Sequence, residues 1–366
     1  MLAASMISLI RRRRIKKRFK ARLTADRPIS GRAGDHPPAL IPHQVTYHVL
    51  RLDDGQQVGV AIAGAGVPFV LLHGIGLHNR TYEQCMSYLP ELGFLAVAIE
   101  APGYGRSSPA ARGADFTTRV DVIRRALDTL GIRRAVVAGH SMGGRSAACF
   151  AALNSRRVLA AVFIDAALGE NWDNALIRRL GSEVAVVCGL VDGIVDAAGN
   201  TWGVSWPERL AYYRMMSGPG RPHLADLVRT PEVARAIAVA ESDQWLAAIR
   251  AAAVPAVVLH GARDLVIPLS DARAAAGLLD APLLTVPEGY HSWLLASPRT
   301  FAATIAEIFA DREPMPRSAA ACFHPDALVL QWIQESRDGL SGTLGRRGFA
   351  KAADRAAEAD WTGSHG

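Results

Sequence analysis

Short apolar runs alternate with longer helical stretches over residues 45–310 of the 366-residue chain. Helical stretches lie, for example, at residues 117–130, 142–153 and 270–279. Strands that are apolar on both faces and separated by helices are typical of a parallel sheet covered on both sides. The pattern therefore predicts an α/β fold, a mainly parallel central sheet with helices on both faces. Seven apolar runs have the length of strands, at residues 58–64, 68–74, 95–101, 135–140, 159–165, 256–262 and 282–288.

The alternation is interrupted by a segment that is rich in tryptophan. Residues 166–253 hold four of the seven tryptophans of the chain, and we interpret this segment as a helical cap inserted over the sheet. The C-terminal residues are polar and Gly-rich, and the N-terminal residues are basic and then rich in Pro and Gly. The predicted organisation is a basic arm and linker (1–42), a core (43–165 and 254–312), a helical cap (166–253) and a C-terminal tail (313–366).

The net charge of +7 comes from one segment of the arm. Residues 11–22, RRRRIKKRFKAR, contain nine basic residues and no acidic one, and removing these nine leaves −2 for the rest of the chain. Each Lys or Arg near an anionic lipid surface contributes about 1 kcal/mol, so we expect reversible, peripheral membrane contact through residues 9–22. A solvated tail is the alternative. Phe19 is the one aromatic residue among these cations, so specific nucleic-acid recognition is not predicted.

Signals for export, membrane insertion and metal binding are missing from the sequence. No run of about eighteen apolar residues occurs, so no transmembrane helix is expected. The apolar residues 1–10 precede the charged run, the reverse of the order in a secretory signal. We therefore expect a cytoplasmic protein that contains no metal and needs no cofactor. The four cysteines form no metal-binding pattern and fit a reducing compartment: Cys85, Cys149, Cys188 and Cys322.

The sequence GHSMG at residues 139–143 follows an apolar run and opens a helical stretch. A strand, a sharp turn at a serine and a helix are the context of the G-x-S-x-G nucleophile elbow. Its glycines let the two backbones approach, which pushes the Ser141 hydroxyl clear of the sheet edge. The positive N-terminal end of the helix also points to this place. The alternative is a Gly-rich turn with an incidental serine.

Other segments that end strands carry the groups that an activated serine needs. LLHGIG, residues 71–76, can offer the N–H of Ile75 to an oxyanion, and Met142 can offer a second N–H. Asp264 follows a strand in LHGARDLVIP, and His291 follows the last strand in VPEGYHSW. An imidazole takes the serine proton and a carboxylate orients the imidazole. Because open α/β sheets build their sites at the carboxyl ends of strands, we expect these groups to meet there.

In combination, these segments resemble the α/β-hydrolase superfamily, in particular its serine esterase and lipase-like branch, over roughly residues 45–310. The resemblance implies the α/β-hydrolase fold and identifies the inserted segment with the cap of that family. It implies that Ser141 is the nucleophile, His291 the general base and acid, and Asp264 the orienting carboxylate. The backbones of Ile75 and Met142 would form the oxyanion hole.

Two positions differ from the family pattern, and several residues compete for these roles. Glu100 stands where the family commonly has aspartate, and Tyr290 separates the predicted catalytic histidine from the glycine that often directly precedes it. Asp165, at the end of another strand, is the alternative acid. Three further histidines border glycine turns and are interpreted as packing or loop-orienting groups: His73, His140 and His260.

The predicted function is hydrolysis of a carboxylic ester through an acyl-enzyme on Ser141. The cap tryptophans fit either a packed core or the wall of an apolar pocket, and Trp202 and Trp206 are the candidates for substrate contact. An apolar cap favours a lipid-like or aromatic small-molecule ester. The same triad can perform C–C bond hydrolysis, perhydrolysis or acyl transfer. Outside catalysis, the alternatives are a ligand-binding protein of this fold and a membrane or nucleic-acid binder led by the arm.

Overall fold

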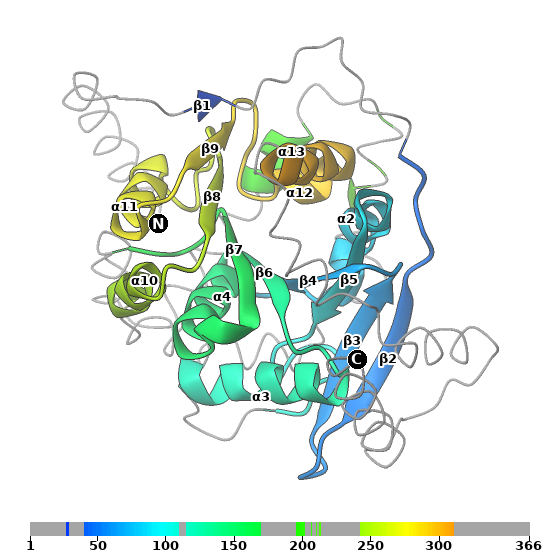
Figure 1. The fold of residues 1–366 in the computed structure, drawn as a ribbon. Helices are drawn as coiled ribbons and strands as arrows, with labels where there is room; N and C mark the ends of the chain where they lie inside the picture. The colour runs from blue at the N-terminus through cyan, green and yellow to red at the C-terminus, as the bar shows by residue number, and fades with distance from the viewer. Residues whose placement is uncertain are drawn as a thin grey trace, which may run out of the picture.

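The structure, a computed structural model, describes residues 27–28, 40–109, 115–169, 195–201, 206, 210, 212–213 and 242–310. Within these ranges the strands form one nine-stranded sheet with the order β1-β9-β8-β7-β6-β4-β5-β3-β2 (Figure 1). Neighbouring strands are parallel except where β3 pairs with β5 and with β2. The strands are β1 Arg27–Pro28, β2 Thr46–Arg51, β3 Gln57–Ala63, β4 Val67–Leu72, β5 Phe94–Ile99, β6 Ala135–His140, β7 Val158–Ile164, β8 Ala256–Gly261 and β9 Leu283–Val286.

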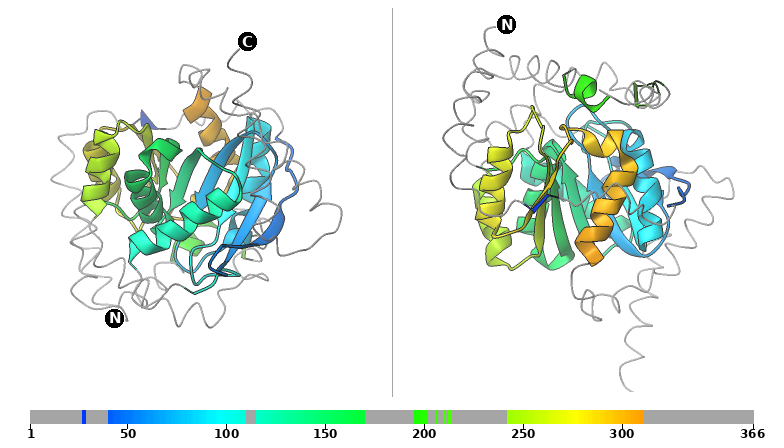
Figure 2. Two further views of the ribbon diagram at one scale, coloured as in Figure 1. Left: turned by 60° about the horizontal axis from the view of Figure 1, so that its bottom comes forward. Right: turned by 90° about the horizontal axis from the view of Figure 1, so that it is seen from above.

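Helices cover both faces of this sheet (Figure 2). One face carries α3, α4, α10 and α11, and the other carries α2, α12 and α13. This arrangement confirms the predicted α/β fold with a mainly parallel sheet. The helices are α2 Glu83–Tyr88, α3 Phe116–Thr129, α4 Met142–Leu153, α10 Ser242–Ala251, α11 Leu269–Leu279, α12 Trp293–Ala296 and α13 Pro298–Ala310, with 3-10 turns η1 Asn79–Tyr82, η2 Leu89–Leu92 and η3 Ser155–Arg157.

The central strands supply two hydrophobic clusters because their side chains alternate between the faces of the sheet. In β4, Val70 and Leu72 belong to the cluster beneath α3 and α4, whereas Phe69 and Leu71 belong to the cluster beneath α2 and α13. A strand that contributes to both clusters is apolar at every position. This is why the predicted runs coincide with β3 to β9.

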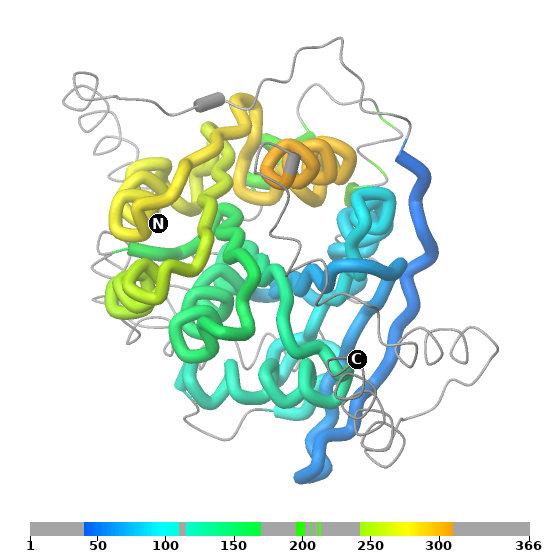
Figure 3. Tube along the Cα trace, in the orientation of Figure 1, coloured from blue at the N-terminus to red at the C-terminus, as the bar shows by residue number. Residues whose placement is uncertain are grey.

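The edge strands were not among the predicted ones. β2 forms one edge of the sheet (Figure 3). Four of its six residues are only half-buried. Partial exposure to water allows its polar sequence TYHVLR, so a search for apolar runs does not find this strand. At the other edge, Arg27–Pro28 pairs with Leu284 and Thr285 of β9, within the segment predicted as arm and linker.

Several predicted segments lie wholly or mostly outside the described residues. They include residues 9–22 of the arm, the tail and most of the cap. Of the predicted cap, the structure describes a helical segment at residues 195–200, a few positions up to residue 213, and α10, which packs against α4 and α11. The domain boundaries therefore stay predictions. In the described part of the chain, no helix is both long and apolar enough to cross a bilayer.

Candidate active site

Ser141 occupies the sharp turn between β6 and α4. Its backbone has φ 55° and ψ −120°, which residues other than glycine rarely adopt. The turn brings the backbones so close that a Cβ at Gly139 would collide with the carbonyl group of Gly143. A Cβ at Gly143 would collide with the carbonyl group of Leu72 at the end of β4. The close approach of β6, α4 and β4 therefore requires the glycines of the motif.

The loop that follows β4 lies directly beside this turn. A Cβ at Gly74 would lie 3.2 Å from the Cβ of Ser141, so the backbone of the loop packs against the serine. Ile75 follows in the chain and packs against the core, and Met142 is the first residue of α4. The first N–H groups of a helix have no partner within the helix. The two predicted oxyanion donors thus belong to segments that meet at Ser141, and their role stays a prediction.

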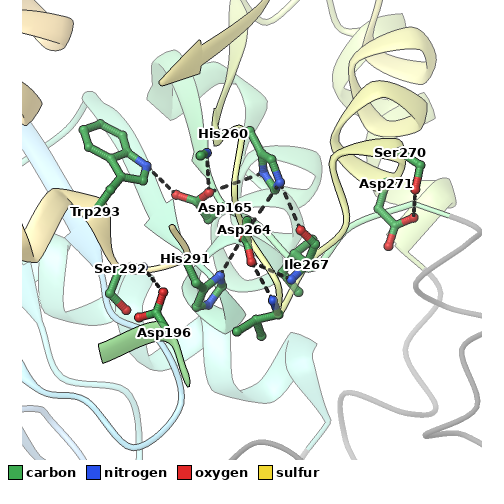
Figure 4. Close-up of polar contacts among 12 residues, drawn as sticks. Asp165, Asp196, His260, Asp264, Ile267, Ser270, Asp271, His291, Ser292 and Trp293 are labelled. Carbon is green, nitrogen blue, oxygen red and sulfur yellow. Dashed lines mark hydrogen bonds and ion pairs between the residues drawn. The ribbon is translucent and has the colours of Figure 1, made fainter. Parts of the chain in front are cut away.

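His291 and Asp264 are hydrogen-bonded to each other at the carboxyl edge of the sheet (Figure 4). Nδ1 of His291 lies 2.8 Å from Oδ2 of Asp264. The other oxygen of Asp264 accepts the N–H groups of Val266 and Ile267 at 2.7 and 2.8 Å. With the Nδ1 proton donated to Asp264, the neutral imidazole carries its lone pair on Nε2. This is the tautomer that a general base requires.

The charge on Asp264 follows from its surroundings. Burial raises the pKa of this carboxyl group, but His291 and its hydrogen bond, together with His260 and the N–H of Ile267, outweigh burial and hold the pKa below its usual value. Asp264 is therefore ionised at neutral pH. A buried carboxylate in this place stabilises the positive charge that His291 acquires when it takes a proton.

Asp165, the alternative acid, lies behind this pair and makes different contacts. Its side chain is fully buried, and its two oxygens accept the N–H of Gly261 and the indole N–H of Trp293, both at 2.7 Å. Burial, and then the negative charge of Asp264, raises the pKa of Asp165 well above its usual value. Asp165 thus connects the end of β8 to the start of α12, which directly follows the loop that carries His291 (residues 287–292, the histidine loop). The hydrogen bond to Nδ1 of His291 favours Asp264 as the orienting carboxylate.

Asp165, Asp264 and His291 also satisfy the distance requirement for a metal site. They offer one ligand atom each within 4.8 Å of one another. However, all four carboxylate oxygens accept hydrogen bonds from N–H groups of the fold. A metal ion would have to displace these bonds, so the donor set suits an oriented imidazole better than a cation.

The other buried histidines hold loops in place. Nδ1 of His73 donates to the carbonyl of the next residue at 2.8 Å, and its Nε2 accepts the N–H of Ala101 at 2.9 Å. Burial lowers the pKa of His73 to about 4 and that of His140 to about 3, so both rings are neutral at pH 7. Nε2 of His260 lies 3.1 Å from the carbonyl oxygen of Ile267, in the loop that carries Asp264. Neutral rings with backbone partners fit orienting roles.

A chain of hydrogen bonds through His140 connects three loops of the site. The carbonyl of His291 can only accept, so Nε2 of His140 carries the proton of this 3.0 Å bond. Nδ1 of His140 then accepts the Tyr82 hydroxyl proton at 2.7 Å, and the hydroxyl oxygen accepts the N–H of Gly74 at 3.1 Å. The serine turn, the loop after β4 and the histidine loop are therefore held together by one connected set of bonds.

Three side chains of the site were missed by reasoning from the sequence: Tyr82, Asp196 and Trp293. Trp293 stands two residues after His291, and that position was an available signal. Tyr82 meets His140 across 58 residues, and Asp196 accepts the N–H of Ser292 at 3.1 Å across 96 residues. No local sequence pattern predicts contacts between residues that are so far apart in the chain.

The structure describes one of the two tryptophans that were predicted to contact substrate. Trp202 lies outside the described residues. Trp206 is described and is 71% exposed, so its ring offers apolar surface to a ligand. Substrate contact by either residue stays a prediction.

Glu100, where the resemblance expects aspartate, fits because two glycines leave room for it. Its Oε2 accepts the N–H of Arg106 at 2.7 Å. A Cβ at Gly59 in β3 or at Gly105 would collide with the Glu100 carboxyl group. The longer side chain is thus accommodated between its own loop and the adjacent strand.

Known proteins share this architecture. A family model described as alpha/beta hydrolase fold matches residues 67–298. A putative non-heme haloperoxidase of Mycobacterium phage D29 is 34% identical over 280 residues, which are 73% of this chain and 96% of that protein. Two solved structures each cover 73% of this chain with all of their own: bromoperoxidase from Bacillus anthracis, with a TM-score of 0.59 and 20% identity, and an esterase from Exiguobacterium antarcticum, with 0.57 and 21%.

At 20–21% identity, the two solved structures bear on the fold alone. The family model covers more than half of the chain, and the phage relative is matched over nearly its whole length. Together they confirm the predicted resemblance to the α/β-hydrolase superfamily, and the chain belongs to the α/β-hydrolase fold family.

Proposed function

We propose that the protein is a serine hydrolase that cleaves a carboxylic ester of an apolar, lipid-like or aromatic substrate through an acyl-enzyme on Ser141. The observation that carries the proposal is the 2.8 Å hydrogen bond between His291 and Asp264. His140, the residue before Ser141, donates to the backbone of His291, which ties this pair to the serine turn. An imidazole oriented by a carboxylate beside a serine on a strained turn makes the serine hydroxyl nucleophilic.

The proposed reaction has two steps that use the same groups. Oγ of Ser141 attacks the ester carbonyl while Nε2 of His291 takes the hydroxyl proton, and His291 then gives this proton to the departing alcohol. Water attacks the resulting acyl-enzyme while His291 takes a proton from the water, and His291 then gives this proton to Oγ of Ser141 as the bond from Oγ to the acyl carbon breaks and the carboxylic acid leaves. Asp264 keeps the imidazole in the correct tautomer and stabilises its charged form in both steps.

The N–H groups of Ile75 and Met142 are proposed to stabilise the tetrahedral intermediate of each step. Negative charge develops on the former carbonyl oxygen, and backbone donors held in place by the fold lower the energy of that charge without rearrangement. The N-terminal end of α4 contributes in the same direction. Loss of one such donor typically lowers kcat by about 10²–10³.

Labelling with a fluorophosphonate probe and a series of p-nitrophenyl esters of increasing acyl length test the proposed function. We expect the probe to modify Ser141 and kcat/KM to rise from the acetate ester to longer acyl chains. Denatured protein is the control for labelling that does not depend on the folded site. A folded protein that neither reacts with the probe nor hydrolyses any ester of the series would be a ligand-binding member of this fold instead.

The cap tryptophans give a prediction about selectivity. Replacing Trp202 or Trp206 by alanine is expected to change the preference for acyl length more than the rate with the acetate ester. One methylene in an apolar pocket accounts for at most about 1–3 kcal/mol of discrimination. Kinetics with the ester series and thermal unfolding of each variant check this. Lower stability with an unchanged ester profile would make both residues packing residues.

A second candidate, perhydrolysis, is favoured by one observation, the 34% identity to a phage protein named as a haloperoxidase. Hydrogen peroxide would replace water in the second step, attack the acyl-enzyme, release a peroxy acid and restore Ser141. Oxidation of iodide during ester turnover with hydrogen peroxide measures this product. Iodide oxidation that depends on both the ester and Ser141 would support perhydrolysis, and hydrolysis without peroxy acid would exclude it.

A further inference from the structure

The helical segment at residues 195–200 touches both neighbours of His291. The carboxyl group of Asp196 accepts the N–H of Ser292, the residue after the histidine, at 3.1 Å (Figure 4). Tyr290, the residue before the histidine, lies with its ring against the backbone of Gly199: a Cβ there would be 2.5 to 2.8 Å from three ring atoms. The chain on each side of His291 is therefore held by the same short segment.

Apolar packing supports these two contacts. Ala197 and Tyr212, both in the predicted cap, pack in the hydrophobic cluster that contains Trp293 and Leu294 of α12. Asp196 is 4% exposed and Tyr212 is 6% exposed, so water is largely excluded from this junction. A buried carboxyl group needs a hydrogen-bond partner, and the N–H of Ser292 supplies one for Asp196.

The contact between Tyr290 and Gly199 also accounts for a departure from the family pattern. The resemblance expects glycine directly before the catalytic histidine, whereas this chain has Tyr290 there. A large side chain in the histidine loop is matched by a residue without a side chain in the cap segment. The pair is complementary in size, so a change on one side alone disturbs the other.

We propose that residues 195–200 position His291, with Asp196 and Gly199 as the positioning residues that fix the backbone after and before it. The inference rests on the proposed function, because it concerns the base of that reaction. A base works only when it is held within about 0.5 Å of its productive place. Proton transfer at Ser141 is therefore coupled to the packing of residues 195–200 against the residues on either side of His291.

Gly199→Ala is the first test, because it adds one methyl group where the Tyr290 ring lies. Displacement of a reacting group by about 1 Å lowers rates by about 10²-fold, so we expect kcat for p-nitrophenyl acetate to fall about 10- to 100-fold. KM is expected to change by less than about 3-fold, because a misplaced base affects proton transfer more than binding. The rate of fluorophosphonate labelling of Ser141 should fall with kcat.

Two further variants separate positioning from a general loss of structure. Gly277→Ala is the matched control, since Gly277 lies in α11 and a Cβ there meets nothing within 4 Å. This control should keep the wild-type rate. In the double variant Gly199→Ala/Tyr290→Ala the clash is removed, and kcat should return to that of Tyr290→Ala alone. A Gly199→Ala variant with the full rate, or one that the second change does not restore, would overturn the proposal.

Asp196 provides an independent test if Gly199→Ala does not fold. Asp196→Ala removes the acceptor of the Ser292 N–H and should lower kcat about 10-fold, and Asp196→Asn should recover most of the loss because its amide oxygen can accept this N–H. Equal kcat for Asp196→Ala and wild type would contradict the proposed role. If wild-type protein itself shows neither labelling nor ester turnover, the proposed function fails. If the wild-type protein is fully active and kcat is unchanged in the variants, only the positioning of His291 by residues 195–200 is rejected.

Discussion

Replacing Ser141 by alanine is expected to lower kcat for ester hydrolysis by roughly 10⁴–10⁶ and to abolish labelling by a fluorophosphonate. Without Oγ no acyl-enzyme can form, and the residual rate comes from binding and from the oxyanion donors. Adding His291→Ala to this variant should lower kcat little further, because a base has no function once the nucleophile is gone. Steady-state kinetics of the two variants measure both effects.

The control for Ser141→Ala is its stability. Alanine keeps the Cβ that serine already holds at φ 55°, so the backbone strain of the turn is unchanged. The free energy of unfolding, measured by thermal unfolding, should therefore change by no more than about 1 kcal/mol. Near-normal ester turnover by a folded Ser141→Ala variant would rule out the acyl-enzyme mechanism.

Replacing Asp264 by asparagine is expected to lower kcat by about 10³–10⁴, the second largest effect. The amide group of asparagine can offer its N–H to Nδ1 of His291, which favours the tautomer with the lone pair on the wrong nitrogen. It also removes the charge that stabilises the imidazolium. Measurement of kcat on a soluble ester, with thermal unfolding to exclude misfolding, tests this expectation.

Asp165→Asn is the matched variant, because it makes the same chemical change in the same buried cluster. Asp165 has a pKa raised by burial and by Asp264, and its contacts are the N–H groups of Gly261 and Trp293. We expect kcat to fall by less than about 10-fold, since Nδ1 of His291 keeps its bond to Asp264. The opposite ranking of the two variants would assign the role of orienting carboxylate to Asp165.

The parts of the fold that could be predicted are those where burial dictates the sequence at every position. β4 and β6 are covered on both faces, so their apolar runs are unambiguous. β2 has only one strand beside it and is largely half-buried, so polar residues are tolerated and the run disappears. A single sequence indicates an edge strand poorly because neither face of it has to be apolar throughout.

In the candidate site too, some contacts could be predicted from the sequence and others could not. Ser141, Asp264 and His291 each follow a strand, and the parallel sheet brings such positions to one edge, so their proximity follows from topology. The contacts of Asp196 and Tyr82 depend on how a cap segment and a helix pack onto that edge. These contacts join residues that are 96 and 58 positions from their partners, and no spacing rule in the sequence encodes them.

The bond between His140 and the carbonyl of His291 spans 151 positions of the chain. At a synthesis rate of about 5–20 residues per second, the serine turn leaves the ribosome roughly 8–30 s before the histidine loop. During that interval the nascent chain carries Ser141 without His291, and β8 and β9 are made only toward its end. The proposed nucleophile therefore meets its proposed base only after residue 291 has been made, and translation products that end before His291 are expected to show no ester hydrolysis.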